Sequence, residues 1–414
     1  MEICIFQTGE PLHIDEGNYR PMRCMLLADK LIEKGHKVTI ISSAFFHQRK
    51  IHRSKHFKLF TINTKLRIYL IPSTGYKKHI SVSRIFDHII LSFNLYLFLK
   101  KYKFFKPDRV FMGYPPIITS FVITRWSIIK RIPVMIDIKD KWPETFIEPF
   151  PKFFKPLAKL LFKPYFILAR YAFKKANKIS TISDGFSSWT KDFIQDKKSD
   201  KYYVYPLTRK PFSLSEDDIF KSIKYWENKN INILNDQYFC FIGSYSRSFN
   251  FEFIYDLSRE LFLKFPYLKI ILCGSGDKYK TLIKKFSSNK NVFVFGEIDK
   301  YNAKVLIKNA LATLAPYNRN INFNDHIPNK IIESLENGTP FVTTLEGTLK
   351  NIIKEYNNGI FLSEDKKSDI KFLEKLIKEK EYQINLSNNA TKSYKKLFDF
   401  NSVYNSLIDN LISI

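Results

Sequence analysis

Cysteine and glycine are scarce in this sequence. Its 414 residues include four cysteines and 13 glycines. The cysteines lie far apart, at Cys4, Cys24, Cys240 and Cys273, and have no metal-ligand spacing. This pattern argues against the dense disulfides of small secreted proteins, and we expect reduced, buried thiols in a cytoplasmic protein. The eight histidines also lack a ligand pattern, so we expect no metal site.

Long apolar runs are absent as well. No stretch reaches the roughly 18 uninterrupted apolar residues of a membrane-spanning helix. The longest candidate, 89–99, contains Ser92 and Asn94. Residues 1–6 have the pattern of a strand and show neither a basic leader segment nor a small-residue cleavage site. We therefore expect no secretory signal.

Acidic residues are too few to balance the basic ones. Asp and Glu number 40 against 67 Lys and Arg, which gives a formal net charge of +27. Such a field attracts polyanions, so nucleic acid, anionic membrane and phosphorylated substrates all stay open as partners. The sequence is also 45% hydrophobic, which is enough for a sizeable core. The length suggests two or three domains of roughly 150 residues each.

Alternating strand and helix patterns predict the fold class. Residues 3–6 predict a strand, 20–33 a helix with apolar residues at helical spacing, and 38–42 a second strand. This strand-helix-strand unit is the repeating element of a parallel sheet. Further strands are expected at 110–112, 134–138 and 178–182, and, after a charged stretch, at 239–242, 268–273, 292–295 and 312–315.

Two successive series of this kind predict two doubly wound, Rossmann-like α/β domains that face each other across a cleft. The charged, proline-containing stretch between the series is typical of a connection. The expected parts are a first domain over 1–205, a connection over 206–236, a second domain over 237–390 and a C-terminal helix over 391–414, for which a return to the first domain is one option.

The segment 326–343 is the most informative of the chain. Pro328 suits the first turn of a helix, and Gly338 suits its C-terminal cap. A helix N-terminus offers unpaired backbone N–H groups and the positive end of the dipole to a phosphate. Lys330 falls in the first turn, and Glu333 lies one turn further on the same face. The pattern therefore predicts a site for a diphosphate and for sugar hydroxyls, with a capped surface helix as the alternative.

Glycine-containing turns follow three expected strands of the second domain. Gly243 and Ser244 follow the first strand, Gly274 the second and Gly296 the third. Ligands of doubly wound sheets bind at the carboxyl ends of the strands, where these turns would expose backbone N–H groups to a phosphate. Arg247 would add a fixed positive charge. Ordinary turns between strands and helices are the alternative.

The first domain carries weaker candidates. Gly9 and Gly17 bracket the loop after the first strand and would allow close approach of a ligand, although their spacing is not the dinucleotide fingerprint. Asp137 and Asp140 follow a strand, where carboxylates bind sugar hydroxyls or assist proton transfer. Asp137 would instead cap the next turn in the alternative interpretation.

Two segments of the first domain, 86–106 and 153–178, combine basic and aromatic residues. Such segments suit the headgroup boundary of an anionic bilayer, and a core helix with a solvated basic face is the alternative. The basic residues of the later segment would share one face of a helix that Pro156 and Pro164 break or kink: Lys155, Lys159, Lys163, Arg170, Lys174 and Lys178. A further basic cluster, with His47, His52 and His56 among Arg49, Lys50, Arg53 and Lys55, would bind an anionic acceptor or form a solvated loop.

Together these motifs resemble the glycosyltransferases of the GT-B fold, specifically the retaining family 4. They are most similar to its bacterial members that build surface polysaccharides such as O-antigen and capsule. The resemblance spans nearly the whole chain and is carried by the segments 9–20, 35–39, 46–53, 137–144 and 328–338.

The resemblance implies a role for each part. The first domain would bind the acceptor, with Gly9, Gly17, Asn18 and Arg20 in its loop. The second domain would bind the nucleotide sugar. Its expected donor-binding residues are Gly243, Ser244, Arg247, Gly274, Gly296, Pro328, Asn329, Lys330 and Glu333.

Within that set, the resemblance implies that Glu333 binds the ribose hydroxyls and that Arg247 and Lys330 neutralise the diphosphate. The turn at Gly296 would offer backbone to the base. Asp325 stands where the family often has the first glutamate of a Glu-x7-Glu pair. The expected catalytic residues are Asp325, Asp140 and Lys330.

The expected function follows from the same resemblance. The enzyme would be a hexosyl- or N-acetylhexosaminyltransferase that moves a sugar, with retention, from a UDP-linked donor to a polyprenyl-linked saccharide in surface polysaccharide biosynthesis. It would need no cofactor or metal and would not bind nucleic acid. It would be cytoplasmic and peripheral on the anionic inner face of the cytoplasmic membrane. A nucleotide-sugar 2-epimerase of the same architecture and a basic nucleic-acid-binding protein are the alternatives.

Overall fold

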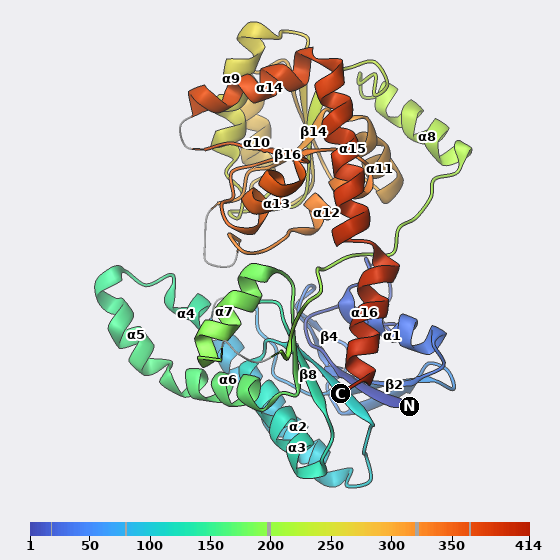
Figure 1. Cartoon of the computed structure of the whole chain (residues 1–414), viewed down its shortest axis with the longest axis vertical. Helices are drawn as coiled ribbons and strands as arrows, with labels where there is room; N and C mark the ends of the chain where they lie inside the picture. The colour runs from blue at the N-terminus through green and yellow to red at the C-terminus, as the bar shows by residue number, and fades with distance from the viewer. Residues whose placement is uncertain (18, 79–80, 197–199, 319–322, 364–365) are drawn as a thin grey trace. The chain divides into compact units, whose positions relative to one another are not determined.

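A computed structural model of the chain describes residues 1–17, 19–78, 81–196, 200–318, 323–363 and 366–414. The chain divides into two compact units (Figure 1). Unit 1 comprises 1–210 together with 400–414, and unit 2 comprises 211–399. Each unit has a largely parallel sheet with helices around it, so the predicted class of two doubly wound α/β domains is confirmed.

Unit 1 contains an eight-stranded sheet in the order β10-β9-β8-β7-β1-β2-β6-β5. All neighbouring strands are parallel except β5, which runs antiparallel to β6. The strand order reverses between β1 and β7, which are paired. The strands are β1 (Glu2–Phe6), β2 (Lys37–Ser43), β5 (Lys58–Thr61), β6 (Leu66–Ile71), β7 (Arg109–Tyr114), β8 (Val134–Ile138), β9 (Lys178–Thr181) and β10 (Tyr202–Val204), with a separate hairpin of β3 (Phe45–Phe46) and β4 (Ile51–His52).

Helices cover both faces of this sheet, so its central strands are apolar on both sides. Ile3 and Ile5 pack on one face with α1 and α16, whereas Cys4 and Phe6 pack on the other with α2, α3 and α6. The helical elements are α1 (Arg23–Glu33), α2 (Val82–Lys101), α3 (Ile117–Lys130), α4 (Glu144–Ile147), the 3-10 helix η1 (Lys152–Phe154), α5 (Lys155–Leu161), α6 (Lys163–Lys175), α7 (Asp184–Ile194) and α16 (Phe400–Ile412).

Unit 2 contains a six-stranded parallel sheet in the order β13-β12-β11-β14-β15-β16, which reverses between β11 and β14. The strands are β11 (Tyr238–Ile242), β12 (Lys269–Cys273), β13 (Val292–Phe295), β14 (Ala312–Ala315), β15 (Phe341–Thr343) and β16 (Gly359–Phe361). The helices are α8 (Glu216–Glu227), α9 (Phe251–Lys264), α10 (Tyr279–Phe286), α11 (Lys300–Asn309), α12 (Asn329–Glu336), α13 (Thr348–Tyr356), α14 (Lys366–Lys378) and α15 (Lys380–Leu397).

The division of the chain differs in detail from the boundaries expected from sequence. Most of the expected connection, 206–236, belongs to unit 2. Its charged residues hide an apolar face, because Trp226 and Ile231 are fully buried in one cluster with Tyr238 of β11. The expected boundary at 390 falls inside α15, and the chain enters unit 1 again at α16.

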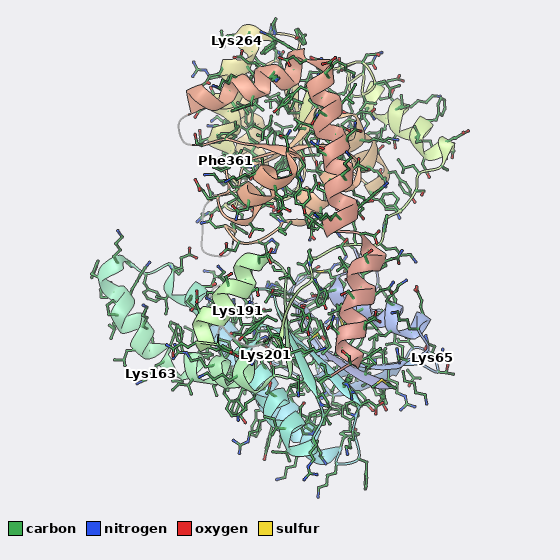
Figure 2. The ribbon with its side chains drawn as sticks, in the orientation of Figure 1. Lys65, Lys163, Lys191, Lys201, Lys264 and Phe361 are labelled. Atoms are coloured by element: carbon green, nitrogen blue, oxygen red, sulfur yellow. The ribbon has the colours of Figure 1, made fainter. Side chains whose placement is uncertain are left out.

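The basic stretch 153–178 is not one helix. Pro156 and Pro164 each lie in the first turn of a separate helix, α5 and α6, where a missing N–H costs nothing. Figure 2 labels Lys163 at the start of α6. Lys178 lies in β9, where its Nζ donates to Asn410. The expected break at the two prolines is therefore confirmed, whereas the placement of Lys178 on the same helical face was wrong.

The four cysteines are buried and unpaired, as expected. Three lie in strands, at Cys4, Cys240 and Cys273, and Cys24 lies in α1. Burial raises the pKa of each thiol, so these sulfurs are packing groups rather than nucleophiles.

Candidate functional site

The three predicted glycine turns of unit 2 lie together at the carboxyl edge of its sheet. Gly274 N donates to the carbonyl of Gly296 at 3.1 Å, and Gly243 N donates to Cys273 at 3.0 Å. A Cβ on Gly274 would lie 1.8 Å from the Gly243 carbonyl oxygen, so these turns approach each other only because a side chain is missing. At Gly296, by contrast, a Cβ would meet nothing closer than the Tyr279 hydroxyl at 3.7 Å.

Helix α12 begins close to this edge. Pro328 is its N-cap residue and Asn329 its first residue, so Pro328 immediately precedes the first turn in which it was expected. The backbone ends the helix as predicted, since Gly338 has a φ of 69° and donates its N–H to Leu335. Ser334 holds the helix in place, because its Oγ accepts from Thr313 of β14 at 2.8 Å.

The side chain of Lys330 lies in a cage of aromatic rings. Its Nζ is 3.9 Å from the ring centres of Phe241 and Phe249 and 5.3 Å from that of Tyr317. A Cβ on Gly243 would lie 2.8 Å from the same nitrogen, so the ammonium is directly below the first glycine turn. It is shielded from solvent and has no hydrogen-bond partner within the described residues. Ring faces attract a cation but do not accept its protons as a carboxylate would.

Burial lowers the pKa of the Lys330 ammonium to about 7, against the opposing influence of Glu333. The Glu333 carboxylate also raises the pKa of Tyr317, although burial of that hydroxyl is the larger cause. Lys330, Glu333 and Tyr317 thus influence one another electrostatically. They lie beside β11 and β14, where the strand order reverses. This is the position at which doubly wound sheets bind their ligands.

The other predicted donor residues lie around this centre. Ser244 and Arg247 are exposed on the loop after β11, and the Arg247 carbonyl accepts from Asn318 at 2.7 Å. Asp325 is half-buried ahead of α12. A Cβ on Gly347 would lie 3.3 Å from Asp325 Oδ1, and Thr348 Oγ1 donates to the Asp325 carbonyl at 3.1 Å. Sequence reasoning therefore assembled the glycines, Lys330 and Glu333, but missed the aromatic cage.

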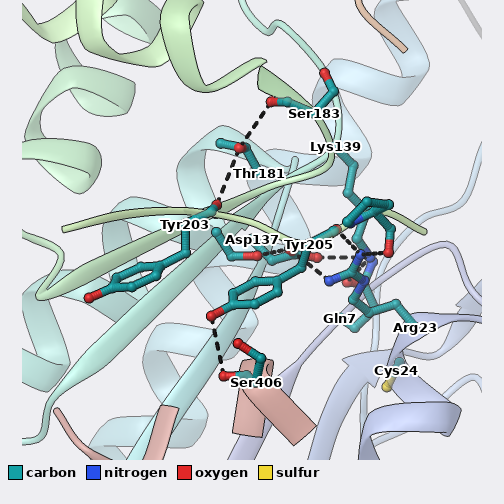
Figure 3. Close-up of polar contacts among 12 residues, drawn as sticks. Gln7, Arg23, Cys24, Asp137, Lys139, Thr181, Ser183, Tyr203, Tyr205 and Ser406 are labelled. Atoms are coloured by element: carbon teal, nitrogen blue, oxygen red, sulfur yellow. Dashed lines mark hydrogen bonds and ion pairs between the residues drawn. The ribbon is translucent and has the colours of Figure 1, made fainter. Parts of the chain in front are cut away.

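Unit 1 has a buried polar network at the carboxyl ends of its strands (Figure 3). Lys139 Nζ donates to Gln7 Oε1 at 2.9 Å and forms an ion pair with Glu10. Asp137 accepts from Ser180 at 2.6 Å. Its carboxylate also lies 3.7 Å from Lys139 Nζ, and Arg23 Nη1 lies 3.6 Å from it on the other side. Asp137 is fully buried and is therefore a structural group of unit 1.

Sequence reasoning named only Asp137 and Asp140 in this region. Asp140 is half-buried, and burial raises the pKa of its carboxyl to about 6 against the influence of Arg84 and Lys139. Its carboxylate is thus ionised above about pH 6, which suits a group that accepts a proton near neutral pH. Gln7 and Glu10 had no recognisable signal, because their role depends on partners more than 100 residues away.

The predicted loop residues of unit 1 lie near the β3–β4 hairpin. Gly9 has a φ of 79°, and a Cβ there would lie 3.9 Å from His47. Gly17 is exposed beside the Arg49 guanidinium, which covers the Tyr19 ring at 4.8 Å. Arg20 is exposed, and Asn18 lies outside the described residues.

A surface depression of about 760 Å³ lies elsewhere, between α9 and residues 288–291. These residues precede β13, so the depression is at the amino edge of the sheet, opposite the glycine turns. It holds none of the predicted site residues. The described residues contain no group of three or more His, Cys, Asp or Glu side chains with the geometry to hold a metal.

Two parallel α/β units with reversal points of this kind define the GT-B class of glycosyltransferase folds. Residues 223–393, most of unit 2, match the family model described as "Glycosyl transferases group 1". This matched segment contains the glycine turns, the aromatic cage and α12. No curated protein matches the chain.

Solved structures share the whole fold. Sucrose-phosphate synthase (tll1590) from Thermosynechococcus elongatus has 12% identity and a TM-score of 0.71, with 99% of this chain and 97% of that chain covered. Anabaena Alr3699/HepE in complex with UDP has 14% identity and a TM-score of 0.65, with both chains fully covered. WaaG, a glycosyltransferase involved in lipopolysaccharide biosynthesis, has 15% identity and a TM-score of 0.63, with 99% of each chain covered. The TM-scores over nearly the whole chains establish a common fold, and at identities this low the likeness extends to the fold alone.

Proposed function

We propose that the protein is a glycosyltransferase that moves a sugar from a UDP-linked donor to a lipid-linked saccharide in surface polysaccharide biosynthesis, with retention of configuration. One observation carries the proposal: Lys330 and Glu333 lie on one helix, inside the glycosyltransferase group 1 match, at the reversal point of the sheet. The similar fold of HepE, which was solved with UDP and with UDP-glucose, supports a uridine nucleotide. The similar fold of WaaG supports a glycoconjugate acceptor.

In this proposal, unit 2 stabilises the leaving nucleoside diphosphate. Negative charge develops on the phosphate oxygens as the bond to the sugar breaks, and positive groups that are already in place lower the barrier. Lys330, Arg247 and the N–H groups that begin α12 supply that charge. Glu333 accepts hydrogen bonds from the ribose hydroxyls, and Asp325 positions the donor sugar. Asp140 of unit 1 takes the proton of the acceptor hydroxyl.

The first prediction tests the nucleotide. UDP at 100 times its dissociation constant should stabilise the protein by about 2.7 kcal/mol. For a unit of this size, that corresponds to a rise in Tm of about 5–10 °C in a thermal-shift assay. UMP, which lacks the second phosphate, should give a smaller shift, and a UDP-sugar incubated without acceptor should not epimerise. A protein whose Tm responds to no nucleotide would refute the proposal.

We further propose that unit 1 docks on an anionic membrane. Helix α5 has its main contacts with its neighbours α4, η1 and α6 and exposes Leu157, Leu160 and Leu161 by 63%, 65% and 71%. Helix α2 is long and apolar enough, by length and composition, to cross a membrane, but Leu91 and Leu95 anchor one side of it in the core.

The outer side of α2 carries an exposed apolar stripe at helical spacing, formed by Val82, Phe86, Ile89, Phe93, Tyr96 and Leu97. Lysines flank both helices, at Lys100 and Lys101 in α2 and at Lys155 and Lys159 in α5. Exposed apolar rows beside cations suit the headgroup boundary of anionic lipid. The acceptor would then be reached from the membrane surface.

The second prediction concerns this surface. Replacing Leu157, Leu160 and Leu161 together by glutamate should lower partitioning into phosphatidylglycerol-containing vesicles by about 100-fold or more, because three apolar side chains no longer enter the bilayer. Flotation with vesicles measures this loss. The matched control is Leu263→Glu, since Leu263 is 88% exposed on unit 2. Equal partitioning of the wild type and the triple variant would contradict membrane docking by α5.

A further inference from the structure

A second cluster of cations and aromatic rings lies in unit 1. Its members follow the carboxyl ends of β2, β6 and β8, and we call them the Lys50–Arg84 cluster: His47, Lys50, Tyr76, Arg84, His88 and Trp142. Helix α2, which holds Arg84 and His88, carries the chain from β6 across to β7, where the strand order reverses. The cluster therefore lies near the reversal point of the first sheet, just as Lys330 does in the second.

Aromatic rings form the floor of the cluster. Tyr76 is 9% exposed and Trp142 is 5% exposed. The Arg84 guanidinium lies 4.8 Å from the Trp142 ring and 5.5 Å from the Tyr76 ring, and Lys50 Nζ lies 4.5 Å from the Tyr76 ring. Both cations therefore cover the same tyrosine, which fixes them close to each other.

Two histidine rings complete the arrangement, and His47 Nδ1 is an acceptor in it, because the Lys50 ammonium can only donate. His47 Nδ1 lies 2.5 Å from the Tyr76 hydroxyl and 3.1 Å from Lys50 Nζ. The His88 ring packs 5.7 Å from that of Trp142, and burial lowers the pKa of this imidazole to about 3, so it stays neutral.

The electrostatics of the cluster favour an anion. Burial lowers the pKa of Lys50 to about 8, and the Arg84 charge lowers it in the same direction. Two carboxylates lie nearby and compete with such an anion: Asp87, which accepts the Gly75 N–H at 2.6 Å, and Asp140, whose charge interacts with those of Arg84 and Lys139. A phosphate bound between Lys50 and Arg84 would relieve their mutual repulsion and receive bidentate hydrogen bonds from the guanidinium.

Neighbouring basic residues do not share this arrangement. Arg53 forms a buried ion pair with Asp15 at 2.6 Å, and Lys55 and His56 are exposed. The basic cluster expected from sequence, which ran from His47 to His56, is therefore split. Only His47 and Lys50 join the side chains from α2 and from the loop after β8.

We propose that the Lys50–Arg84 cluster binds the diphosphate of the lipid-linked acceptor, an inference that rests on the proposed glycosyltransferase function. Paired cations over aromatic rings match a diphosphate flanked by an apolar chain. The exposed stripe of α2 lies on the opposite face of that helix from Arg84, so the rings of Tyr76 and Trp142 are the apolar surface next to the cations.

The test uses the full chain saturated with UDP, so that the donor site is filled, and titrates it with inorganic pyrophosphate in a calorimeter at pH 7. Lys50→Gln and Arg84→Gln should each weaken pyrophosphate binding about tenfold or more, which is a loss of about 1.4 kcal/mol per factor of ten. The matched controls are Lys55→Gln and Arg125→Gln, which remove the same charge from exposed positions. They should change the affinity by less than about twofold, as is usual for exposed charges. Lys50→Arg keeps the charge and should retain most of the binding.

Equal losses in the four glutamine variants, or none in Lys50→Gln and Arg84→Gln, would overturn the proposal. If Arg84→Gln does not fold, the comparison of Lys50→Gln with Lys50→Arg tests the proposal. Farnesyl diphosphate should bind more tightly than pyrophosphate and lose the same factor in Lys50→Gln. Weaker binding of farnesyl diphosphate would show a site for free phosphate and overturn the assignment to the acceptor. Failure of UDP to raise the Tm would refute the proposed function, whereas the pyrophosphate titration tests anion binding by the Lys50–Arg84 cluster separately.

Discussion

Replacing Lys330 by methionine should lower the rate of sugar transfer by about 10²–10³-fold, the usual effect of removing one preorganised group that stabilises developing negative charge. The side chain meets the requirements for such an effect. Its Nζ is held by Phe241 and Phe249, is shielded from water and lies directly below Gly243. Methionine keeps the apolar contacts of the cage and removes only the charge, so the variant should still fold.

The same substitution should abolish a proton uptake that accompanies UDP binding. With a pKa of about 7, Lys330 is mostly neutral at pH 8, and a bound diphosphate would draw a proton back onto it. Linkage then predicts an uptake of about 0.9 proton per UDP at pH 8, which falls towards zero at pH 5 because the amine is already charged there. Calorimetry in two buffers of different ionisation enthalpy measures this number. The matched control is Lys354→Met on the exposed surface of α13, which should leave it unchanged.

The pH dependence of the free energy of unfolding should also reflect Lys330. The folded pKa of Lys330 lies below its ordinary value of 10.5, so the unfolded chain binds more protons between about pH 7 and pH 10.5. The free energy of unfolding of the wild type should therefore rise with pH across this window relative to that of Lys330→Met. An identical pH dependence of unfolding in the two proteins would contradict a lowered pKa.

Replacing Glu333 by alanine should weaken UDP binding by about 10²-fold or more. A carboxylate that accepts hydrogen bonds from two ribose hydroxyls contributes about 1.5–3 kcal/mol for each bond to a charged group. The loss should be equally large for uridine, which keeps the ribose, whereas Lys330→Met should affect UDP and leave uridine binding unchanged. The matched control is Glu355→Ala, an exposed glutamate of α13. Unchanged UDP affinity in Glu333→Ala would remove Glu333 from the donor site.

The sequence predicted the fold class because both sheets have strand runs that are apolar on two faces, separated by helical spacing. It also placed Lys330 and Glu333 on one face of a helix that ends at Gly338, because capping residues and a spacing of three are local properties. The sequence also predicted that the glycine turns at Gly243, Gly274 and Gly296 lie close together, since the carboxyl ends of parallel strands share one edge of the sheet.

Other features depend on contacts that no local pattern encodes. The cage around Lys330 consists of Phe241 from β11, Phe249 from the loop after β11 and Tyr317 from the segment after β14. In the sequence, Arg84 and His88 are ordinary residues of an apolar helix. Only the tertiary structure shows that they contact Tyr76 and Trp142. The charged surface of α8 concealed the buried Trp226, which is why that segment read as a connection.

Helix α16 has a consequence for biosynthesis. Leu407 and Ile408 cover the same apolar face of the first sheet as Ile3 and Ile5. The first strand can therefore bury this face only after residues about 400 positions later have been synthesised. Unit 2 emerges from the ribosome in between and can fold while its partner is still incomplete. Truncation after residue 399 would expose the apolar face of unit 1 that α16 covers. We expect such a fragment to aggregate rather than to form an independent domain.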